Sequence, residues 1–284
     1  MEQPQGFVDI VLPDGRVTPL KIETYTLIGA DRLAKNITAN IGRPIPRMDR
    51  RLGFGAIKGE PLAIVAAGPT LNDTIESLRG FKNILVCGSA HDHLIRLGVV
   101  PTFAMVCDGG VDDKGNLSLR QKDTTYLIAS QCDPSLFDHL QDCHVEMWHY
   151  RGQAAADVEA ERELLFGEQS VGWGSTVGIL SLSIALLLGY QDVHFFGFDS
   201  SYGDYGLKHH CCDIAGSMEY EKKPVTIGDK TFITDLGLIE QASQFFRFIE
   251  ANHEFIHCTL YGDGMIAEMV RQGDPGLLKF INLA

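Results

Sequence analysis

Residues 169–202 have the sequence QSVGWGSTVGILSLSIALLLGYQDVHFFGFDSSY, and this stretch decides the fold class. A polar loop with glycines opens an apolar run over residues 177–188, which is typical of a buried helix and ends at Gly189. A β-rich run over residues 193–198 follows and places Asp199 at its end. In α/β folds the N-terminus of a helix can bind an anion, and the carboxyl end of a neighbouring strand presents side chains to the same ligand-binding crevice. The stretch therefore predicts one half of an α/β ligand site.

The chain on either side of this stretch alternates short apolar runs with helical segments. This rhythm is typical of a parallel sheet with helices on both faces. We therefore predict a Rossmann-like, mostly parallel α/β fold, with a hairpin that turns near Gly228. The expected strands cover residues 62–67, 83–87, 102–107, 126–129, 144–148 and 255–261. One expected helix follows the first of these strands and ends near residue 78, and the others cover residues 91–97, 135–140, 155–166 and 236–250.

The first sixty residues follow a different pattern. Residues 7–22 alternate apolar and polar side chains around a turn at residues 13–15, which is a hairpin signal. Residues 31–41 are expected to form a helix, and the prolines and glycine at residues 42–46 end it. We interpret residues 1–59 as a small N-terminal appendage, either an oligomer contact or a lid, and residues 60–284 as the catalytic domain.

Composition excludes several classes of protein. The 284 residues are 45% hydrophobic and 21% charged, which is enough to bury a sizeable core. The formal net charge of -13 argues against a protein that coats nucleic acid or an acidic membrane, although small anionic ligands remain compatible. The longest apolar run is too short for a membrane span. Seven cysteines without paired spacing, and a start without a secretory pattern, favour a reduced, cytoplasmic protein, with a homo-oligomer as an option.

Side chains at the ends of the expected strands are the candidates for a ligand site. The first is the turn Gly68, Pro69, Thr70, Leu71 and Asn72. Its glycine allows close approach of a ligand, its proline stiffens the turn, and its polar side chains lie beside a helix start. A tight turn with a helix cap is the structural alternative. The turn is not a Gly-rich dinucleotide fingerprint, and no P-loop lysine motif occurs.

Three further strand ends carry candidates. Asp108 follows the third strand of the expected sheet, Asp199 ends the stretch quoted above, and Asp263 lies between two glycines, where a turn residue is the more common role. His91 and His93 flank a helix start after the second strand and can approach the same crevice, with a helix cap or a solvated face as the alternative.

The order of these motifs resembles a known family. A Gly-Pro-Thr-Leu turn at residues 68–71, a strand that ends in Asp108, a Gly-Ser-Thr helix start at Gly174, Ser175 and Thr176, and Gly-Phe-Asp before Tyr202 look like the 6-hydroxymethylpterin diphosphokinase MptE-like family. That family includes the motility accessory factors thought to glycosylate flagellin. The same order is similar to bacterial sialyltransferases of the CMP-sugar type. The resemblance covers roughly residues 61–270 and leaves the first sixty unexplained.

The resemblance to sialyltransferases implies a glycosyltransferase with a nucleotide-sugar donor. The Gly68 turn and the helix start at Gly174, Ser175 and Thr176 would hold the nucleotide, with Asp199 on the reacting side. A histidine after Tyr202 would take the proton of the acceptor hydroxyl, and His209 and His210 both stand at a suitable interval.

The resemblance to the pterin enzymes implies a different reaction. Asp108 and Asp199 would hold Mg²⁺ between ATP phosphates while a pterin hydroxyl attacks. The chain departs from the Asp-x-Asp-Gly pattern of the archaeal enzymes, because residues 106–110 read VCDGG, one carboxylate short. We therefore rank glycosyl transfer first, pyrophosphoryl transfer second, and a nucleotide-binding module without turnover third.

A zinc site at residues 209–213, HHCCD, is not favoured, since neighbouring side chains diverge and no second ligand pair supports it.

Overall fold

The structure is a computed structural model that describes residues 7–11, 17–21, 28–48, 59–111, 113–151, 165, 167–172, 174–206, 210–213, 220–273 and 280–284. A nine-stranded sheet forms its centre, in the order β13-β12-β9-β3-β4-β5-β6-β7-β8, and every neighbouring pair is parallel. The strands are β3 (Leu62–Val65), β4 (Asn83–Cys87), β5 (Phe103–Val106), β6 (Thr125–Ala129), β7 (His144–Arg151), β8 (Ser170–Gly172), β9 (Asp192–Phe196), β12 (His257–Tyr261) and β13 (Ile281–Leu283). The predicted α/β class is confirmed.

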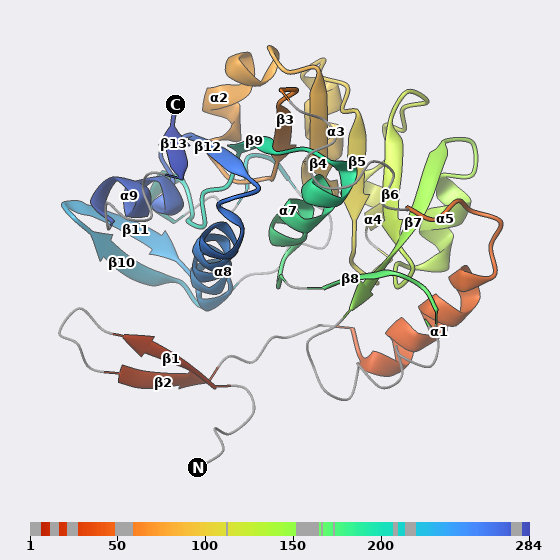
Figure 1. Ribbon diagram of the computed structural model, residues 1–284, viewed down its shortest axis with the longest axis horizontal. Coiled ribbons are helices and arrows are strands. Elements are labelled where there is room, and N and C mark those ends of the chain that lie inside the picture. Colours follow the sequence, from red (N-terminus) through yellow and green to blue (C-terminus); the bar gives the residue numbers. More distant parts are fainter. Residues whose placement is uncertain are drawn as a thin grey trace.

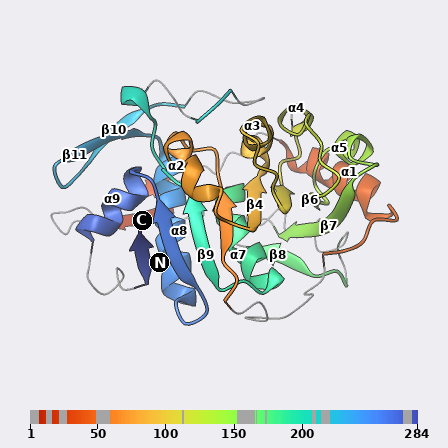
Figure 2. The same cartoon turned by 90° about the horizontal axis from the view of Figure 1, so that it is seen from above.

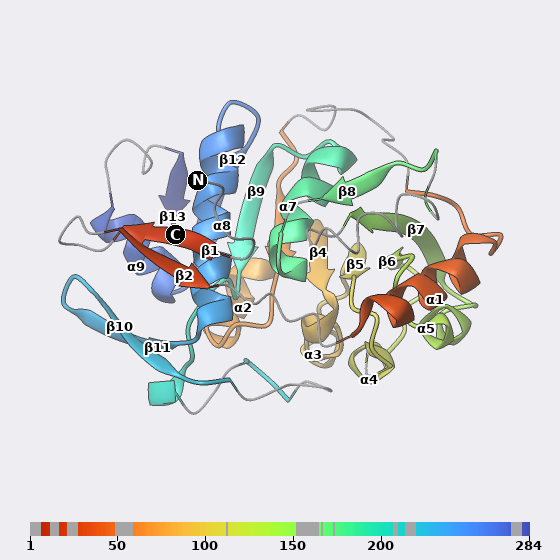
Figure 3. The same cartoon turned by 90° about the horizontal axis from the view of Figure 1, so that it is seen from below.

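Helices cover the sheet on both faces. Helices α7 and α8 lie over one face (Figure 3), and α2 lies over the other (Figure 2). The helices are α1 (Ala30–Ile41), α2 (Leu71–Leu78), α3 (His91–Arg96), α4 (Asp113–Asn116), α5 (Pro134–His139), α7 (Val177–Leu188), α8 (Leu236–Asn252) and α9 (Met265–Gln272). Within the described residues, no helix has both the length and the apolar character that a membrane span requires.

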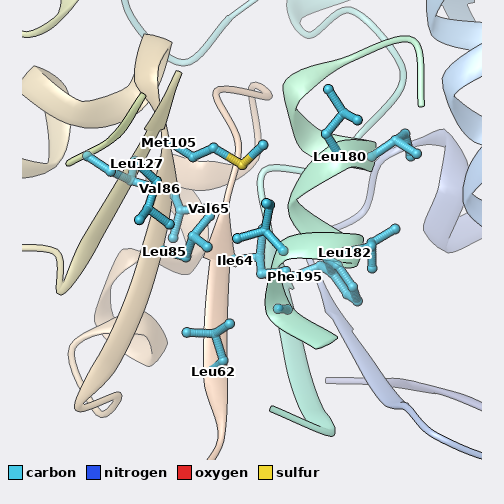
Figure 4. Close-up of a cluster of buried hydrophobic side chains, with 14 of the residues drawn as sticks. Leu62, Ile64, Val65, Leu85, Val86, Met105, Leu127, Leu180, Leu182 and Phe195 are labelled. Carbon is cyan, nitrogen blue, oxygen red and sulfur yellow. The ribbon is translucent and has the colours of Figure 1, made fainter. Parts of the chain in front are cut away.

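The core forms where the central strands meet α7. All residues of β3 and β4 are buried, because helices cover both of their faces. Helix α7 is apolar on nearly all sides and inserts Leu180 and Leu182 among side chains of β3 and β9, such as Ile64 and Phe195 (Figure 4). Full burial of one such side chain stabilises the fold by about 1.5–3 kcal/mol. The apolar run that the sequence places at residues 177–188 is thus a core helix.

The sheet reverses its winding direction between β3 and β9. After β3 the chain continues to β4 on one side, whereas after β9 it continues toward β12 on the other side (Figure 1). Such a switch point opens a crevice at the carboxyl ends of the two strands. The crossover from β8 to β9 carries α7 from the edge of the sheet over β5, β4 and β3.

Two antiparallel hairpins stand outside the sheet (Figure 1). Strands β1 (Phe7–Val11) and β2 (Val17–Lys21) form the predicted N-terminal hairpin. Strands β10 (Lys223–Ile227) and β11 (Lys230–Thr234) form the second, which docks on the loop after β9 through a backbone bridge between Tyr202 and Ile233. The predicted helix over residues 155–166 falls almost entirely outside the described residues. Sequence analysis missed β8, β13, α4 and α9, which are short or lack a clear period.

Helix α1 is bonded to the main domain. The buried Asn40 carboxamide donates to the carbonyls of Ser130 and Cys132, at 3.0 and 2.8 Å, and Asn36 donates to the carbonyls of Gly109 and Gln131, at 3.2 and 2.9 Å. These loops follow β5 and β6. Helix α1 lies within the predicted N-terminal appendage, and these four hydrogen bonds join it to the loops after β5 and β6.

Candidate functional site

The Gly68 turn and Asp199 meet at the switch point of the sheet. Val65 and Phe196 are register partners at the ends of β3 and β9, and the Gly68 N–H donates to the carbonyl of Gly197 at 3.0 Å. The Asp199 carboxylate accepts the Thr70 N–H at 2.8 Å and the Thr70 hydroxyl at 2.5 Å. The structure thus brings together the two halves that the sequence places 129 residues apart.

Three glycines enclose the Asp199 side chain. A Cβ atom at Gly68 or Gly264 would overlap Asp199, and one at Gly262 would overlap the Thr70 hydroxyl. Asp199 is accordingly only 3% exposed. Burial raises the pKa of its carboxyl to about 6, against the opposing effect of the two Thr70 hydrogen bonds. In this position Asp199 fixes the Gly68 turn to the ends of β9 and β12.

The predicted anion site at the start of α7 is already bonded to α8. Both the N–H and the hydroxyl of Ser175 donate to the Gln244 side chain, at 2.8 and 3.0 Å. The Thr176 hydroxyl accepts the Ile179 N–H at 3.3 Å, as an N-cap, and the Gln241 amide at 3.1 Å. Gly174, with φ of +129°, turns the chain into this cap. Ser175 and Thr176 thus join the start of α7 to α8 in this structure, and their contact with a nucleotide stays a prediction.

Asp108 lies apart from Asp199. Strands β3 and β4 separate β5 from β9, so the two strand ends are about 14 Å apart at about 4.8 Å per strand. Two ligands of one Mg²⁺ lie within about 4 Å of each other, at metal distances of about 2.1 Å. With the Asp199 carboxylate enclosed as well, these two residues do not fit a shared Mg²⁺ site.

The Asp108 side chain is exposed, yet the atoms around it raise the pKa of its carboxyl. The following Gly109 is held there by Asn36 of α1. Among the residues that the structure describes, no group of three His, Cys, Asp or Glu side chains is placed to hold a metal ion. The zinc cluster at residues 209–213 was not favoured, and its His209 lies outside the described residues.

The segment that carries His210 packs on the Gly68 turn. The Cys211 N–H donates to the Ala67 carbonyl at 2.8 Å, and its carbonyl accepts the Asn72 amide at 3.0 Å. His210 is the partly exposed residue next to this anchor. Of the two histidines that the sequence offers as a base, the structure therefore places the described one beside the turn.

His93 is the residue to which sequence analysis gave too little weight. Its Nε2 lies 2.6 Å from the side-chain oxygen of Asn72, so the start of α3 contacts the Gly68 turn directly. Burial, and then the charge of Arg96, lower the pKa of the His93 imidazole. Its position after the second strand of the first βαβ unit is the signal that could have found it. The neighbouring His91 is fully buried and bonded to Asp92 at 2.8 Å, which makes it part of the core.

Residues 31–205 match the family described as 6-hydroxymethylpterin diphosphokinase MptE-like. The chain belongs to this family. The matched residues run from α1 through the Gly68 turn to the loop after Asp199. No match was found among the curated proteins.

Two solved structures are similar to this member of the MptE-like family. The Maf glycosyltransferase from Magnetospirillum magneticum AMB-1 superposes with a TM-score of 0.62 at 17% identity, over 84% of this chain and 37% of that chain. This chain therefore spans about a third of that glycosyltransferase, and the likeness concerns the fold. A mammalian sialyltransferase, in complex with Gal-beta-1-3GalNAc-ortho-nitrophenol, gives a TM-score of 0.43 at 12% identity, over 81% of this chain and 79% of that chain.

Proposed function

We propose that this domain is a transferase that binds a nucleotide sugar at the Gly68 turn and transfers the sugar to a hydroxyl acceptor. The observation that carries the proposal is the contact of the Cys211 backbone with Ala67 and Asn72, because it brings a histidine segment to a turn at the switch point. Imidazole suits a general base, since its pKa lies near neutral pH. The name of the similar Maf glycosyltransferase agrees with this choice.

In the proposed reaction the acceptor oxygen bonds to the anomeric carbon of the sugar. The bond between that carbon and the phosphate oxygen breaks, and the nucleotide leaves with the electron pair. A histidine of the segment after Tyr202, His209 or His210, takes the hydroxyl proton. The Gly68 turn follows β3 at the switch point of the sheet, where α/β folds bind nucleotides. Asp199 acts by holding Thr70 and hence the shape of the turn.

A ligand screen tests the first half of the proposal. We expect the melting temperature of the full chain to rise with one of CMP, UDP, GDP or ATP, or with a sugar conjugate of one of them. A ligand at 100 times its Kd adds about 2.7 kcal/mol to the free energy of unfolding, which is readily measured. A set of nucleotides that leaves the melting temperature unchanged would contradict nucleotide binding altogether.

Substitution of the histidines tests the second half. With His209→Ala and His210→Ala combined, we expect sugar transfer to fall by about 10²–10⁴-fold while the nucleotide still stabilises the protein. His144→Ala is the matched control, because His144 is exposed at the amino end of β7, whereas the proposed site lies at the carboxyl ends of the strands. Full activity in the double variant would show that neither histidine is the general base. Nucleotide binding without any transfer in the wild type would favour the binding module.

The family name supports one alternative, an ATP- and Mg²⁺-dependent transfer of pyrophosphate to a pterin hydroxyl. The separation of Asp108 from Asp199 argues against the metal site that this reaction was expected to use. Pyrophosphate transfer that stops on removal of Mg²⁺ and in Asp108→Asn would establish the alternative over glycosyl transfer.

A further inference from the structure

A chain of three groups crosses from α3 to the loop after β9. His93 Nε2 lies 2.6 Å from Asn72 Oδ1, and Asn72 Nδ2 donates to the Cys211 carbonyl at 3.0 Å. Asn72 is the second residue of α2 and the last of the Gly68 turn. The chain therefore lies along the carboxyl ends of β3 and β4, beside the place where the nucleotide is proposed to bind.

This chain of contacts determines which nitrogen of His93 carries the proton. A carbonyl oxygen only accepts hydrogen bonds, so the amide nitrogen of Asn72 must face Cys211 and the amide oxygen must face His93. The oxygen likewise only accepts, so Nε2 of His93 is the protonated nitrogen. In the neutral ring the lone pair then lies on Nδ1. No described residue makes a hydrogen bond to Nδ1.

The surroundings of His93 favour the neutral ring. Burial lowers the pKa of His93, and Arg96 on the same helix acts in the same direction. Asp92 of this helix is bonded to His91 and to the backbone of Ser118 and Leu119. The other titratable groups of the adjoining described elements are Asp73 and Glu76 on α2, and His210, Cys211, Cys212 and Asp213 on the loop. At neutral pH His93 therefore offers an acceptor at Nδ1.

An acceptor at this place has a known use in βαβ nucleotide sites. There the turn after the first strand approaches the phosphates, and a carboxylate about 20 residues further on, at the end of the second strand, accepts the ribose 2′-hydroxyl. Here β3 is the first strand, the Gly68 turn follows it, and His93 comes about 25 residues later, after β4. We propose that Nδ1 of His93 accepts a hydrogen bond from the ribose 2′-hydroxyl of the nucleotide.

The inference rests on the proposed nucleotide binding, and it predicts a preference for ribose over deoxyribose. A histidine that instead contacts a phosphate would act on ribonucleotides and deoxyribonucleotides alike. The two contacts are therefore distinguishable by the ratio of the two Kd values.

The test compares ribonucleotides with deoxyribonucleotides on the full chain. The probes are CMP, UMP, GMP and AMP and their 2′-deoxy counterparts. For the wild type we expect the Kd of the deoxy form to be about tenfold higher at neutral pH, which corresponds to one hydrogen bond of about 1.4 kcal/mol. In His93→Gln both forms should bind like the deoxy form to the wild type. A glutamine amide reaches Asn72 from the position of Nε2 but places no acceptor at Nδ1.

Two more variants complete the design. His93→Asn places its amide oxygen near the position of Nδ1, so the preference for ribose should return. His257→Gln is the matched control, since His257 is exposed at the amino end of β12, and its Kd values should equal those of the wild type.

A ratio of deoxy to ribose Kd that is equal in the wild type and in folded His93→Gln overturns the inference and leaves the proposed function standing. If none of the eight nucleotides binds the wild type, the proposed nucleotide site and this inference both fail.

Discussion

Asp199 is the residue at which the ends of β3, β9 and β12 converge. Its carboxylate holds Thr70, and its backbone lies against Gly264. Because the folded protein raises the pKa of this carboxyl to about 6, from an ordinary value of 3.8, its folded form binds protons more tightly than its unfolded form. Stability from this group is therefore present below pH 4 and is lost as the pH rises through 6.

Asp199→Asn removes this titration. An asparagine keeps one acceptor for the Thr70 N–H and offers a donor to the Thr70 hydroxyl, so we expect the fold to be retained. Relative to this variant, the free energy of unfolding of the wild type should fall by about 2 kcal/mol between pH 4 and pH 7. Urea unfolding across this range measures the difference. A difference that stays constant, or grows with pH, would show that the carboxyl is not shifted upward.

Gly264 is required because the space beside it leaves no room for a side chain. Its φ of −66° suits any residue, so only space is at issue. In Gly264→Ala the Cβ would overlap Asp199, and we expect a loss of about 1–3 kcal/mol in the free energy of unfolding. Gly42→Ala is the control, because a Cβ at Gly42 meets nothing within 4 Å. Equal stability of both variants would argue against the tight enclosure of Asp199.

At the scale of elements, α8 sets the start of α7. The Gln244 side chain accepts both donors of Ser175, and Gln241 binds both Thr176 and Ser200. A helix start otherwise leaves unpaired N–H groups. The contact between the two helices provides the Ser175 N–H with an acceptor.

Gln244→Ala should leave the Ser175 N–H without its acceptor in a partly buried place. We expect a loss of about 1–3 kcal/mol in the free energy of unfolding, measured by urea or thermal unfolding. Arg247→Ala, an exposed position on the same helix, is expected to change stability by less than about 0.5 kcal/mol. If the two variants unfold alike, Gln244 does not hold the start of α7.

At the scale of the whole molecule, α1 is hydrogen-bonded to loops at the carboxyl ends of the sheet. It clamps the loops after β5 and β6 through Asn36 and Asn40, and the family match begins within it. The Gly109 loop beside Asp108 is thus shaped by a segment that precedes the sheet in the chain.

Asn40→Ala tests this arrangement. Two buried carbonyls would lose their donor, and we expect the free energy of unfolding to fall by about 1–3 kcal/mol in a single transition. Lys35→Ala, on the exposed side of α1, serves as the comparison and should be near neutral. A wild-type unfolding curve for Asn40→Ala would mean that α1 is an independent appendage, as the sequence suggested.

The sequence by itself determined the order of the elements and the residues at strand ends. The apolar run at residues 177–188 and the β-rich runs are local signals, because period and turn residues act within a few positions of the chain. The helix α7 has the predicted bounds, and the predicted central strands are all present, with ends that differ by at most three residues. Helix α9 and strand β13, which were not predicted, have only eight and three residues.

Only the tertiary structure decided which strand ends share a site. The order of the strands puts Asp199 beside the Gly68 turn and keeps Asp108 away from it, and neither fact is written in a local pattern. The use of Ser175 by Gln244, and the contact of His93 with Asn72, likewise join residues that are distant in the chain. The physical reason is that hydrogen-bond partners in the site are selected by the packing of the helices on the sheet, which depends on all of the core at once.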